Sequence, residues 1–368
     1  MKGFSGFRFI LSMLIKSVDF NMDFIKIQNK RFFNNSHKIV GWFNGYPSMS
    51  LYTPPFFSKP SVNSLITREM SLYQWRKLPE LMSIAITPNC NCDCMYCSFT
   101  SMKKEENPLS TQEIKKVIKD AQALGVSTVS LVGGEPLMNN DIFEIIQSVD
   151  KEFSQVIMFT NGYYLKEKAK DLRKAGLTTA IVSIDSYNPT KHNQIKGKEE
   201  LFEKAILGIK EAKKQGLLVG MSSVVHKPDF ENGNLIKLFD LAKDLKINEL
   251  IVFDAMPTGN YSNRTDLLWN KSDIDKLINL CEEYSKKKNY PNIYPYAYMK
   301  SEKSIGCAGG TFYFYVSPYG DVCPCDFNSF SVGNIKKESL NKLWNKFNTT
   351  NGFCGSSADG CKIDYNKD

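Results

Sequence analysis

Histidine, long apolar runs and export signals are scarce or missing in this chain. It has three histidines among 368 residues, so we do not expect a histidine general base. The apolar run at residues 9–15 is shorter than the roughly 20 apolar residues that cross a bilayer. No small-residue cleavage site follows it, which argues against a secretory signal. No basic and aromatic module typical of nucleic-acid binding is found, so we expect no nucleic-acid partner.

Cysteine, by contrast, is abundant. Ten cysteines without an export signal indicate a reducing cytosol and metal binding rather than disulfides. The net charge of +8 comes from lysines scattered over helical patterns, which we interpret as solvated helix faces. Residues 1–20 also fit an amphipathic helix at a membrane surface, although packing on the protein or an irregular end is the favoured interpretation. We therefore expect a cytoplasmic protein, with peripheral membrane contact as the alternative.

The densest group of cysteines has a spacing that suits a metal centre. Cys90, Cys94 and Cys97 form C-x3-C-x2-C just after a strand-like run at residues 83–88. Three thiolates on a [4Fe-4S] cluster leave one iron open to chemistry. Structural zinc would need a second cysteine pair nearby, and a disulfide is not expected in a chain without a secretion signal. Inert buried cysteines rarely occur four in eight residues. The spacing therefore favours iron–sulfur. We interpret Cys92, inside the first gap, as a spare thiol, with a rival ligand as the alternative.

This spacing resembles the signature of the radical S-adenosylmethionine (radical SAM) enzymes. The aromatic Tyr96 fits the family position that typically lies near the adenine. The resemblance implies that S-adenosylmethionine chelates the open iron through its amino and carboxylate groups. It also implies that one electron from the cluster cleaves it to methionine and a 5′-deoxyadenosyl radical. A reducing partner such as ferredoxin or flavodoxin would supply that electron.

Strand-like and helix-like patterns alternate from residue 83 to about 254, in the manner of an α/β protein. Six candidate strands begin near residues 83, 128, 155, 179, 217 and 249. Amphipathic helices are expected near residues 111–124, 141–149, 166–175, 198–215, 234–245 and 271–288. Helical crossovers of this length imply parallel strands. The pattern fits an open doubly wound sheet or a partial barrel, and the resemblance selects a partial (β/α)6 TIM-like barrel.

We expect three segments: an N-terminal extension (1–80), the radical SAM partial barrel (81–290) and a cysteine-rich tail (291–368). Residues 22–43 contain short strand-like runs, and residues 46–60 contain prolines that argue against regular structure. We interpret this extension as a cover over the open end of the barrel. The alternative is a small domain that grips a leader peptide, as in some relatives that act on peptides.

A Gly-Gly-Glu-Pro motif follows the second candidate strand. Gly133 and Gly134 let the backbone approach a ligand closely, and Glu135 can accept hydrogen bonds from an amine. Alone, such a tetrapeptide indicates only a turn. Its place after C-x3-C-x2-C resembles the family's motif for the methionyl amino group of S-adenosylmethionine.

The next strand ends carry further polar side chains. The resemblance places Asn161 near the nucleoside, although Asn-Gly is also a common turn. It places Ser183 and Asp185 at a ribose-binding strand end. Lys196 replaces the arginine of a common family stretch, so it would bind the methionine carboxylate only as a point charge.

The tail contains a second group of cysteines. A predicted hairpin would bring Cys307 and Cys325 together, and Cys354 and Cys361 complete a set of four thiolates. Cys323 competes for a place in that set. Four protein ligands would close a cluster to substrate and leave it electron transfer, structure or both. Structural zinc is the alternative.

The tail resembles the SPASM/twitch extensions of radical SAM enzymes. The pattern Cys307-x12-Gly320-x4-Cys325 matches their opening, and Asn334 with Trp344 fits the helix that follows. A full SPASM domain has a further dense cysteine cluster that is missing here. The resemblance therefore implies one auxiliary iron–sulfur cluster, of the [4Fe-4S] type.

Together these motifs imply an enzyme that abstracts a hydrogen atom from a peptide or protein side chain, giving a modified or oxidised residue or a crosslink. Oxidation of a small molecule, or of a lipid, is the runner-up. A non-enzymatic iron–sulfur or zinc-binding protein is the alternative of another class. Asp326 follows Cys325 as the proposed base does in the anaerobic sulfatase maturases, so the resemblance implies a general base there. A turn-capping role for Asp326 is the alternative.

Overall fold

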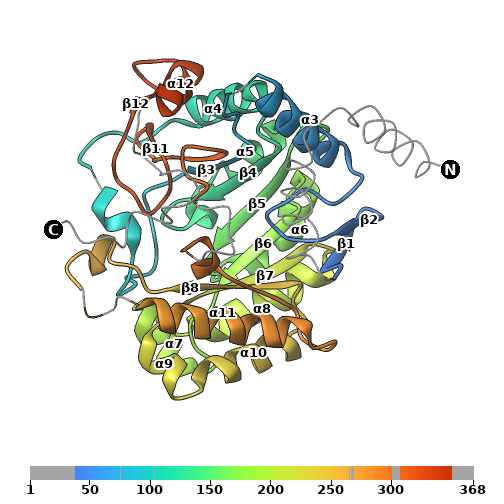
Figure 1. Cartoon of the computed structure of the whole chain (residues 1–368), viewed down its shortest axis with the longest axis vertical. Coiled ribbons are helices and arrows are strands. Elements are labelled where there is room, and N and C mark those ends of the chain that lie inside the picture. Colours follow the sequence, from blue (N-terminus) through green and yellow to red (C-terminus); the bar gives the residue numbers. More distant parts are fainter. Residues whose placement is uncertain are drawn as a thin grey trace.

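The computed structural model describes residues 38–74, 76–102, 104–264, 266, 269–300 and 307–349. The expectations for residues 1–37, and for Cys354 and Cys361, lie outside these residues. A mostly parallel sheet forms the centre of the molecule, with the strand order β12-β11-β10-β3-β4-β5-β6-β7-β8-β9 (Figure 1). The barrel is partial and does not close, because β9 and β12 end this order.

The strands of this sheet fall where the sequence alternates. They are β3 (Leu81–Ala85), β4 (Thr128–Val132), β5 (Gln155–Thr160), β6 (Thr179–Ser183), β7 (Leu218–Val225), β8 (Glu249–Asp254), β9 (Asn292–Pro295), β10 (Tyr313–Val316), β11 (Asp321–Cys323) and β12 (Gly333–Asn334). The six predicted strands are β3 to β8, and each pairs in parallel with the next. The α/β partial barrel is thereby confirmed.

Helices connect these strands and cover the outer face of the sheet (Figure 1). They are α4 (Thr111–Leu124), α5 (Ile142–Ser148), α6 (Leu165–Ala175), α7 (Pro189–Lys196), α8 (Leu201–Lys214), α9 (Lys227–Glu231), α10 (Asn234–Asp244), α11 (Lys271–Lys286) and α12 (Leu340–Thr349). None of the described helices is long and apolar enough to cross a membrane. The helix ends follow local chemistry: α4 begins in a capping box of Ser110 and Glu113 and ends at Gly125 in the left-handed region.

The tail joins the barrel sheet. β10 pairs in parallel with β3, and β11 returns antiparallel to β10 as the predicted hairpin. The sequence patterns did not predict the pairing of β10 with β3, nor β9, which pairs in parallel with β8. The carboxyl end of β10 therefore lies at the same edge of the sheet as those of β3 to β8.

The N-terminal cover is more regular than its prolines indicated. β1 (Gly41–Phe43) pairs with β2 (Tyr46–Ser48), which includes Pro47, and helix α3 (Lys59–Tyr73) has Pro60 in its first turn. The prediction of irregular structure is confirmed for residues 49–58, which form no helix or strand, and was wrong for the two ends of the stretch. A two-stranded ribbon leaves many backbone groups unpaired, and proline is tolerated at the start of a helix where no intrahelical N–H bond is lost.

Leu51, just after this ribbon, plugs the inside of the barrel. Alternate residues of β5, β6 and β8 face either the helices or the inner cluster. Leu51 is 1% exposed and packs in the inner cluster with Ile157, Ile181, Leu218 and Ile251. The cover thus closes one end of the barrel and leaves the carboxyl-end edge for the site.

We expect Glu249→Ala to loosen this plug. The buried Glu249 carboxylate accepts hydrogen bonds from the backbone N–H of Leu51 (2.6 Å), from Ser50 and from the Asn292 amide (2.7 Å). Alanine would strand these donors and lower the free energy of unfolding by about 2–4 kcal/mol. Urea denaturation measures the change, with exposed Glu199→Ala as the matched control. Equal stability of the two variants would show that Glu249 does not hold the plug.

Candidate functional site

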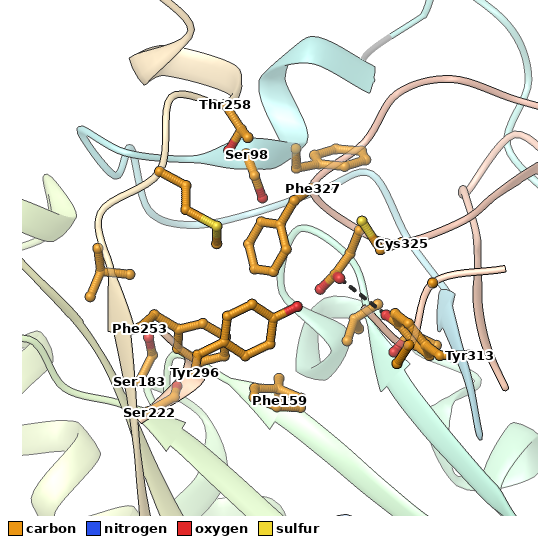
Figure 2. Close-up of a pocket in the computed structure, with 18 of the residues that line it drawn as sticks. Ser98, Phe159, Ser183, Ser222, Phe253, Thr258, Tyr296, Tyr313, Cys325 and Phe327 are labelled. Carbon is orange, nitrogen blue, oxygen red and sulfur yellow. Dashed lines mark hydrogen bonds between the residues drawn. The ribbon is translucent and has the colours of Figure 1, made fainter. Parts of the chain in front are cut away.

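The predicted site residues gather at the carboxyl-end edge of the sheet. The cysteine loop follows β3, Gly133–Pro136 follows β4, Asn161 follows β5, and Ser183 ends β6. A cavity of about 480 Å³ opens there, with Cys94, Tyr96, Cys97, Gly133 and Ser183 among its lining residues. Figure 2 shows Ser183 and Ser222 on one side of this cavity and Cys325 and Tyr313 on another.

The cysteine loop is held from below by the end of α7. The backbone N–H of Asp93 donates to the carbonyl of Lys196 (2.9 Å), and that of Met95 donates to the carbonyl of Ile195 (3.1 Å). A Cβ on Gly197 would lie 2.7 Å from the Asp93 carbonyl oxygen, so only glycine allows this approach. The stretch that ends in Lys196-Gly197 therefore supports the loop through its main chain as well as through the lysine.

The thiols of this loop act on one another electrostatically. Hydrogen bonding with Cys92 lowers the pKa of the Cys90 thiol, whereas burial raises the pKa of Cys94 to about 11. Lys196 is the cation whose charge opposes this rise at Cys94. As the side chains stand, no three His, Cys, Asp or Glu side chains in the described part of the chain adopt metal-ligating positions.

An orphaned donor in the same loop fits a cluster beside it. The Tyr163 backbone N–H donates to Asn161 Oδ1 (2.9 Å), so Asn161 must donate through Nδ2, to Asn91 Oδ1 (2.7 Å) and Cys92 Sγ (3.3 Å). This fixes the orientation of the Asn91 amide and leaves its buried Nδ2 without a protein partner. A cluster sulfur suits such a donor. The thiols, Lys196 and Asn91 therefore fit an open-iron cluster held by Cys90, Cys94 and Cys97.

The side-chain contacts of Asn161 and Asn91 could not be predicted from the motif spacing. The prediction placed Asn161 near a nucleoside, but its amide contacts the cysteine loop. Asn91 was not predicted at all. It lies in the variable x3 gap, where no pattern in a single sequence marks it.

Gly133 and Gly134 allow a close approach of two backbone segments. A Cβ on Gly133 would lie 2.6 Å from the Thr87 carbonyl oxygen, and one on Gly134 would lie 2.2 Å from that of Asn89. Backbone hydrogen bonds join the same segments, from Gly134 to Thr87 (2.9 Å) and from Glu135 to Asn89 (2.7 Å). The glycines thus join β4 to the base of the cysteine loop, and Gly133 also lines the cavity.

Glu135 is buried and bridges the ends of β4 and β5. It is 1% exposed, and its carboxylate accepts from Thr160 Oγ1 (2.6 Å), from the Asn161 N–H (2.7 Å) and from the Leu137 N–H (3.1 Å). Burial raises its pKa to about 7, although these hydrogen bonds oppose the rise. A carboxylate has about four acceptor positions, so these three hydrogen bonds leave one unfilled, which the expected contact with the ligand amine would use.

We expect Glu135→Gln to weaken S-adenosylmethionine binding roughly ten- to a hundredfold without loss of iron, because a charge-assisted hydrogen bond contributes about 1.5–3 kcal/mol. Isothermal titration of the reconstituted protein measures the affinity. Thermal unfolding measures how much the Glu135 bridge between β4 and β5 stabilises the protein. Exposed Glu167→Gln is the control. A variant that unfolds earlier but binds the ligand as before would reduce Glu135 to a bridge between strands.

Asp185, Lys196 and Tyr96 form one buried network. Lys196 Nζ lies 3.0 Å from Asp185 Oδ2 and donates to Ser183 Oγ (2.7 Å), and the Tyr96 hydroxyl donates to Asp185 Oδ2 (2.6 Å). Burial raises the pKa of Asp185, but the charge of Lys196 and the hydrogen bonds that the carboxylate accepts together outweigh burial and hold that pKa below its usual value. The resemblance gave these residues separate contacts with the ligand. The structure pairs them with one another, next to Cys94.

The described tail cysteines separate into two environments. Cys307 and Cys325 line the cavity that Cys94 and Cys97 also line. Cys323 instead packs in an apolar cluster with Phe99, Met102, Tyr315 and Tyr319, and burial raises its pKa to about 12. The geometry thus favours Cys325 over Cys323 as the partner of Cys307.

Asp326 also lines this shared cavity. Its Oδ1 accepts a hydrogen bond from the Tyr313 hydroxyl at 3.1 Å (dashed line in Figure 2). Burial raises the pKa of its carboxyl group, and this hydrogen bond opposes the rise. A carboxylate with a raised pKa, facing a cavity, is a stronger base than an ordinary aspartate and is suited to accept a proton.

Comparison with protein families assigns two parts of the chain. The model described as "Radical SAM superfamily" matches residues 84–242, and the SPASM model, described as "Iron-sulfur cluster-binding domain", matches residues 307–362. The first match includes the cysteine loop, and the second includes Cys307, Cys325, Cys354 and Cys361.

The chain resembles sequence relatives and solved structures of several kinds. An AdoMet-dependent heme synthase from Methanosarcina barkeri is 28% identical over 72% of this chain and 82% of its own length. A GTP 3′,8-cyclase from Aquifex aeolicus is 31% identical over 55% of this chain and 64% of its own length. Streptococcus suis SuiB bound to precursor peptide SuiA superposes with a TM-score of 0.65 at 17% identity, over 96% of this chain and 84% of that one. The structure of anSMEcpe with bound AdoMet superposes with a TM-score of 0.59 at 20% identity, over 74% of this chain and 83% of that one.

Proposed function

Because the chain belongs to the radical SAM superfamily and ends in a SPASM iron–sulfur domain, we propose that it abstracts a hydrogen atom from a side chain of a peptide or protein, leaving an oxidised or crosslinked residue. Its cofactors are a [4Fe-4S] cluster, S-adenosylmethionine and an auxiliary iron–sulfur cluster. The observation that carries the proposal is the shared cavity, which is lined by Cys94 and Cys97 from one end and by Cys307, Cys325 and Asp326 from the other.

The bound cluster and S-adenosylmethionine supply the one-electron chemistry that removes hydrogen from an unactivated carbon. Cys90, Cys94 and Cys97 would hold that cluster, and Cys307 and Cys325, with Cys354 and Cys361, would hold the auxiliary one. Lys196 places a positive charge beside the cysteine loop, and Asp185 fixes its position. Gly133, Ser183 and Ser222 line the cavity beside Cys94, where they would contact S-adenosylmethionine.

Asp326 would act on the substrate. A substrate radical on a carbon that bears a hydroxyl or thiol group loses its electron more easily once that group loses its proton. Asp326 Oδ2 would accept the proton, and an auxiliary cluster held by Cys307 and Cys325 would supply the acceptor for the electron. The Tyr313 hydrogen bond to Oδ1 holds the carboxylate in orientation. Aromatic walls around the cavity would exclude water from this step.

Structural likeness supports a peptide over a small molecule. SuiB is bound to a precursor peptide in one structure, and anSMEcpe is bound to AdoMet with the Cp18Cys peptide in another. Both superpose on about three-quarters of this chain or more. The heme synthase and GTP cyclase relatives favour a small molecule as the second candidate.

Co-expression tests the proposal directly. The chain is produced anaerobically together with each short reading frame that neighbours its gene, and the peptides are analysed by mass spectrometry. We expect one peptide to lose the mass of hydrogen atoms at a single side chain, and to be unchanged when the cysteine loop carries alanines. Turnover of GTP or of a porphyrin precursor with every peptide unchanged would favour the second candidate.

A further inference from the structure

The described residues that line the cavity carry negative charge and no positive charge. Among the described residues that line it, the charged side chains are the carboxylates of Asp254 and Asp326, and no lysine, arginine or histidine lines it. The buried cation nearest to the cysteine loop, Lys196, is paired with Asp185 at 3.0 Å and does not line the cavity. A substrate phosphate or carboxylate group placed beside Asp326 would face other carboxylates, and no described lining residue would offer it a cation in place of its hydration.

Aromatic rings make up much of the wall beside Asp326. Phe253 lies near the end of β8, Tyr296 follows β9, and Phe327 follows β11 and is the neighbour of Asp326 in the chain. Their ring centroids lie 4.8 Å (Phe253–Tyr296), 5.7 Å (Tyr296–Phe327) and 6.0 Å (Phe253–Phe327) apart. Figure 2 shows these three rings around one side of the cavity. We call them the aromatic wall.

These observations restrict the substrate. Burying an anion without a partner is costly, whereas an apolar side chain gains free energy against aromatic rings. We infer that the side chain which enters the cavity carries no negative charge, packs an apolar body against the aromatic wall and directs a hydrogen-bond donor to Asp326. This inference rests on the proposed peptide substrate and narrows it to residues without a negative charge, preferably aromatic ones.

Matched peptides test the charge preference. The probes are the capped tripeptides acetyl-Ala-Tyr-Ala-amide and acetyl-Ala-Glu-Ala-amide, with GTP as a small anionic probe. Each is titrated into the anaerobic holoenzyme with S-adenosylmethionine bound, and binding is followed by ligand-observed NMR. We expect the tyrosine probe to bind at least roughly tenfold more tightly than the glutamate probe, and GTP not to compete with it.

A charge placed on the aromatic wall should reverse the preference. Phe327→Arg supplies the missing cation, so we expect the glutamate probe to gain and the tyrosine probe to lose roughly tenfold each. Phe330→Arg is the control, because Phe330 lies on the same loop, is 47% exposed and does not line the cavity. Circular dichroism verifies that both variants fold.

Several outcomes would overturn the inference. Equal binding of the two peptides, no saturable binding of the tyrosine probe at millimolar concentration, or equal effects of Phe327→Arg and Phe330→Arg would each do so. A co-expressed peptide modified at an acidic residue would also overturn it, and would leave the proposed peptide function standing. Tight GTP binding together with unmodified peptides would contradict both this inference and the proposed peptide function.

Discussion

Simultaneous replacement of Cys90, Cys94 and Cys97 by alanine is expected to abolish reductive cleavage of S-adenosylmethionine and to remove one iron–sulfur cluster. The three thiols come from one loop after β3, and no other described cysteine except Cys92 lies in that loop. The auxiliary cluster should survive, because Cys307 and Cys325 come from the tail. Anaerobic reconstitution, iron and sulfide counting and an assay for 5′-deoxyadenosine measure these effects.

Cys92→Ala is the matched control within the same loop. Cys92 accepts a hydrogen bond from Asn161 and is hydrogen-bonded with the Cys90 thiol, a position that suits a supporting thiol as well as a ligand. We expect this variant to keep its full iron content. Loss of a whole cluster would make Cys92 a ligand, and 5′-deoxyadenosine production by the triple variant would refute the assignment of Cys90, Cys94 and Cys97.

The partial barrel could be predicted because its signals are local. Each strand from β3 to β8 is a short apolar run followed by an amphipathic helix, and such periodicity can be read from a single sequence. β10 carries no such signal for its partner. It lies beside β3, more than 200 residues earlier in the chain, and only the three-dimensional packing determines this pairing. The insertion of Leu51 into the barrel also depends on three-dimensional packing, so it could not be predicted from the sequence.

The candidate site was predictable to the level of strand ends. Parallel strands bring their carboxyl ends to one edge, so Gly133, Asn161 and Ser183 were expected near the cysteine loop. The contacts between side chains were not predictable. The pairing of Asp185 with Lys196, and the aromatic wall from three separate segments, depend on how elements pack, for which a single sequence has no pattern.

Asp326→Asn is expected to separate radical generation from product formation. Asparagine keeps an acceptor for the Tyr313 hydroxyl and nearly the same shape, but it cannot take a proton. 5′-Deoxyadenosine should still form, while oxidised product should fall by about the 10²–10⁴-fold that a lost general base costs. Mass spectrometry of the peptide found by co-expression, alongside chromatography of 5′-deoxyadenosine, measures the two rates.

Tyr313→Phe tests the same role through pH. Burial raises the pKa of Asp326, and the hydrogen bond from Tyr313 lowers it, so removal of the hydroxyl should raise this pKa further. The carboxylate that accepts the proton would then form only at higher pH, and the rising limb of the pH–rate profile should move upward. A base requires both results: near-complete loss in Asp326→Asn and a shifted but active Tyr313→Phe. Unchanged product in Asp326→Asn would make Asp326 structural, and the reaction would then be one that needs no base at this position.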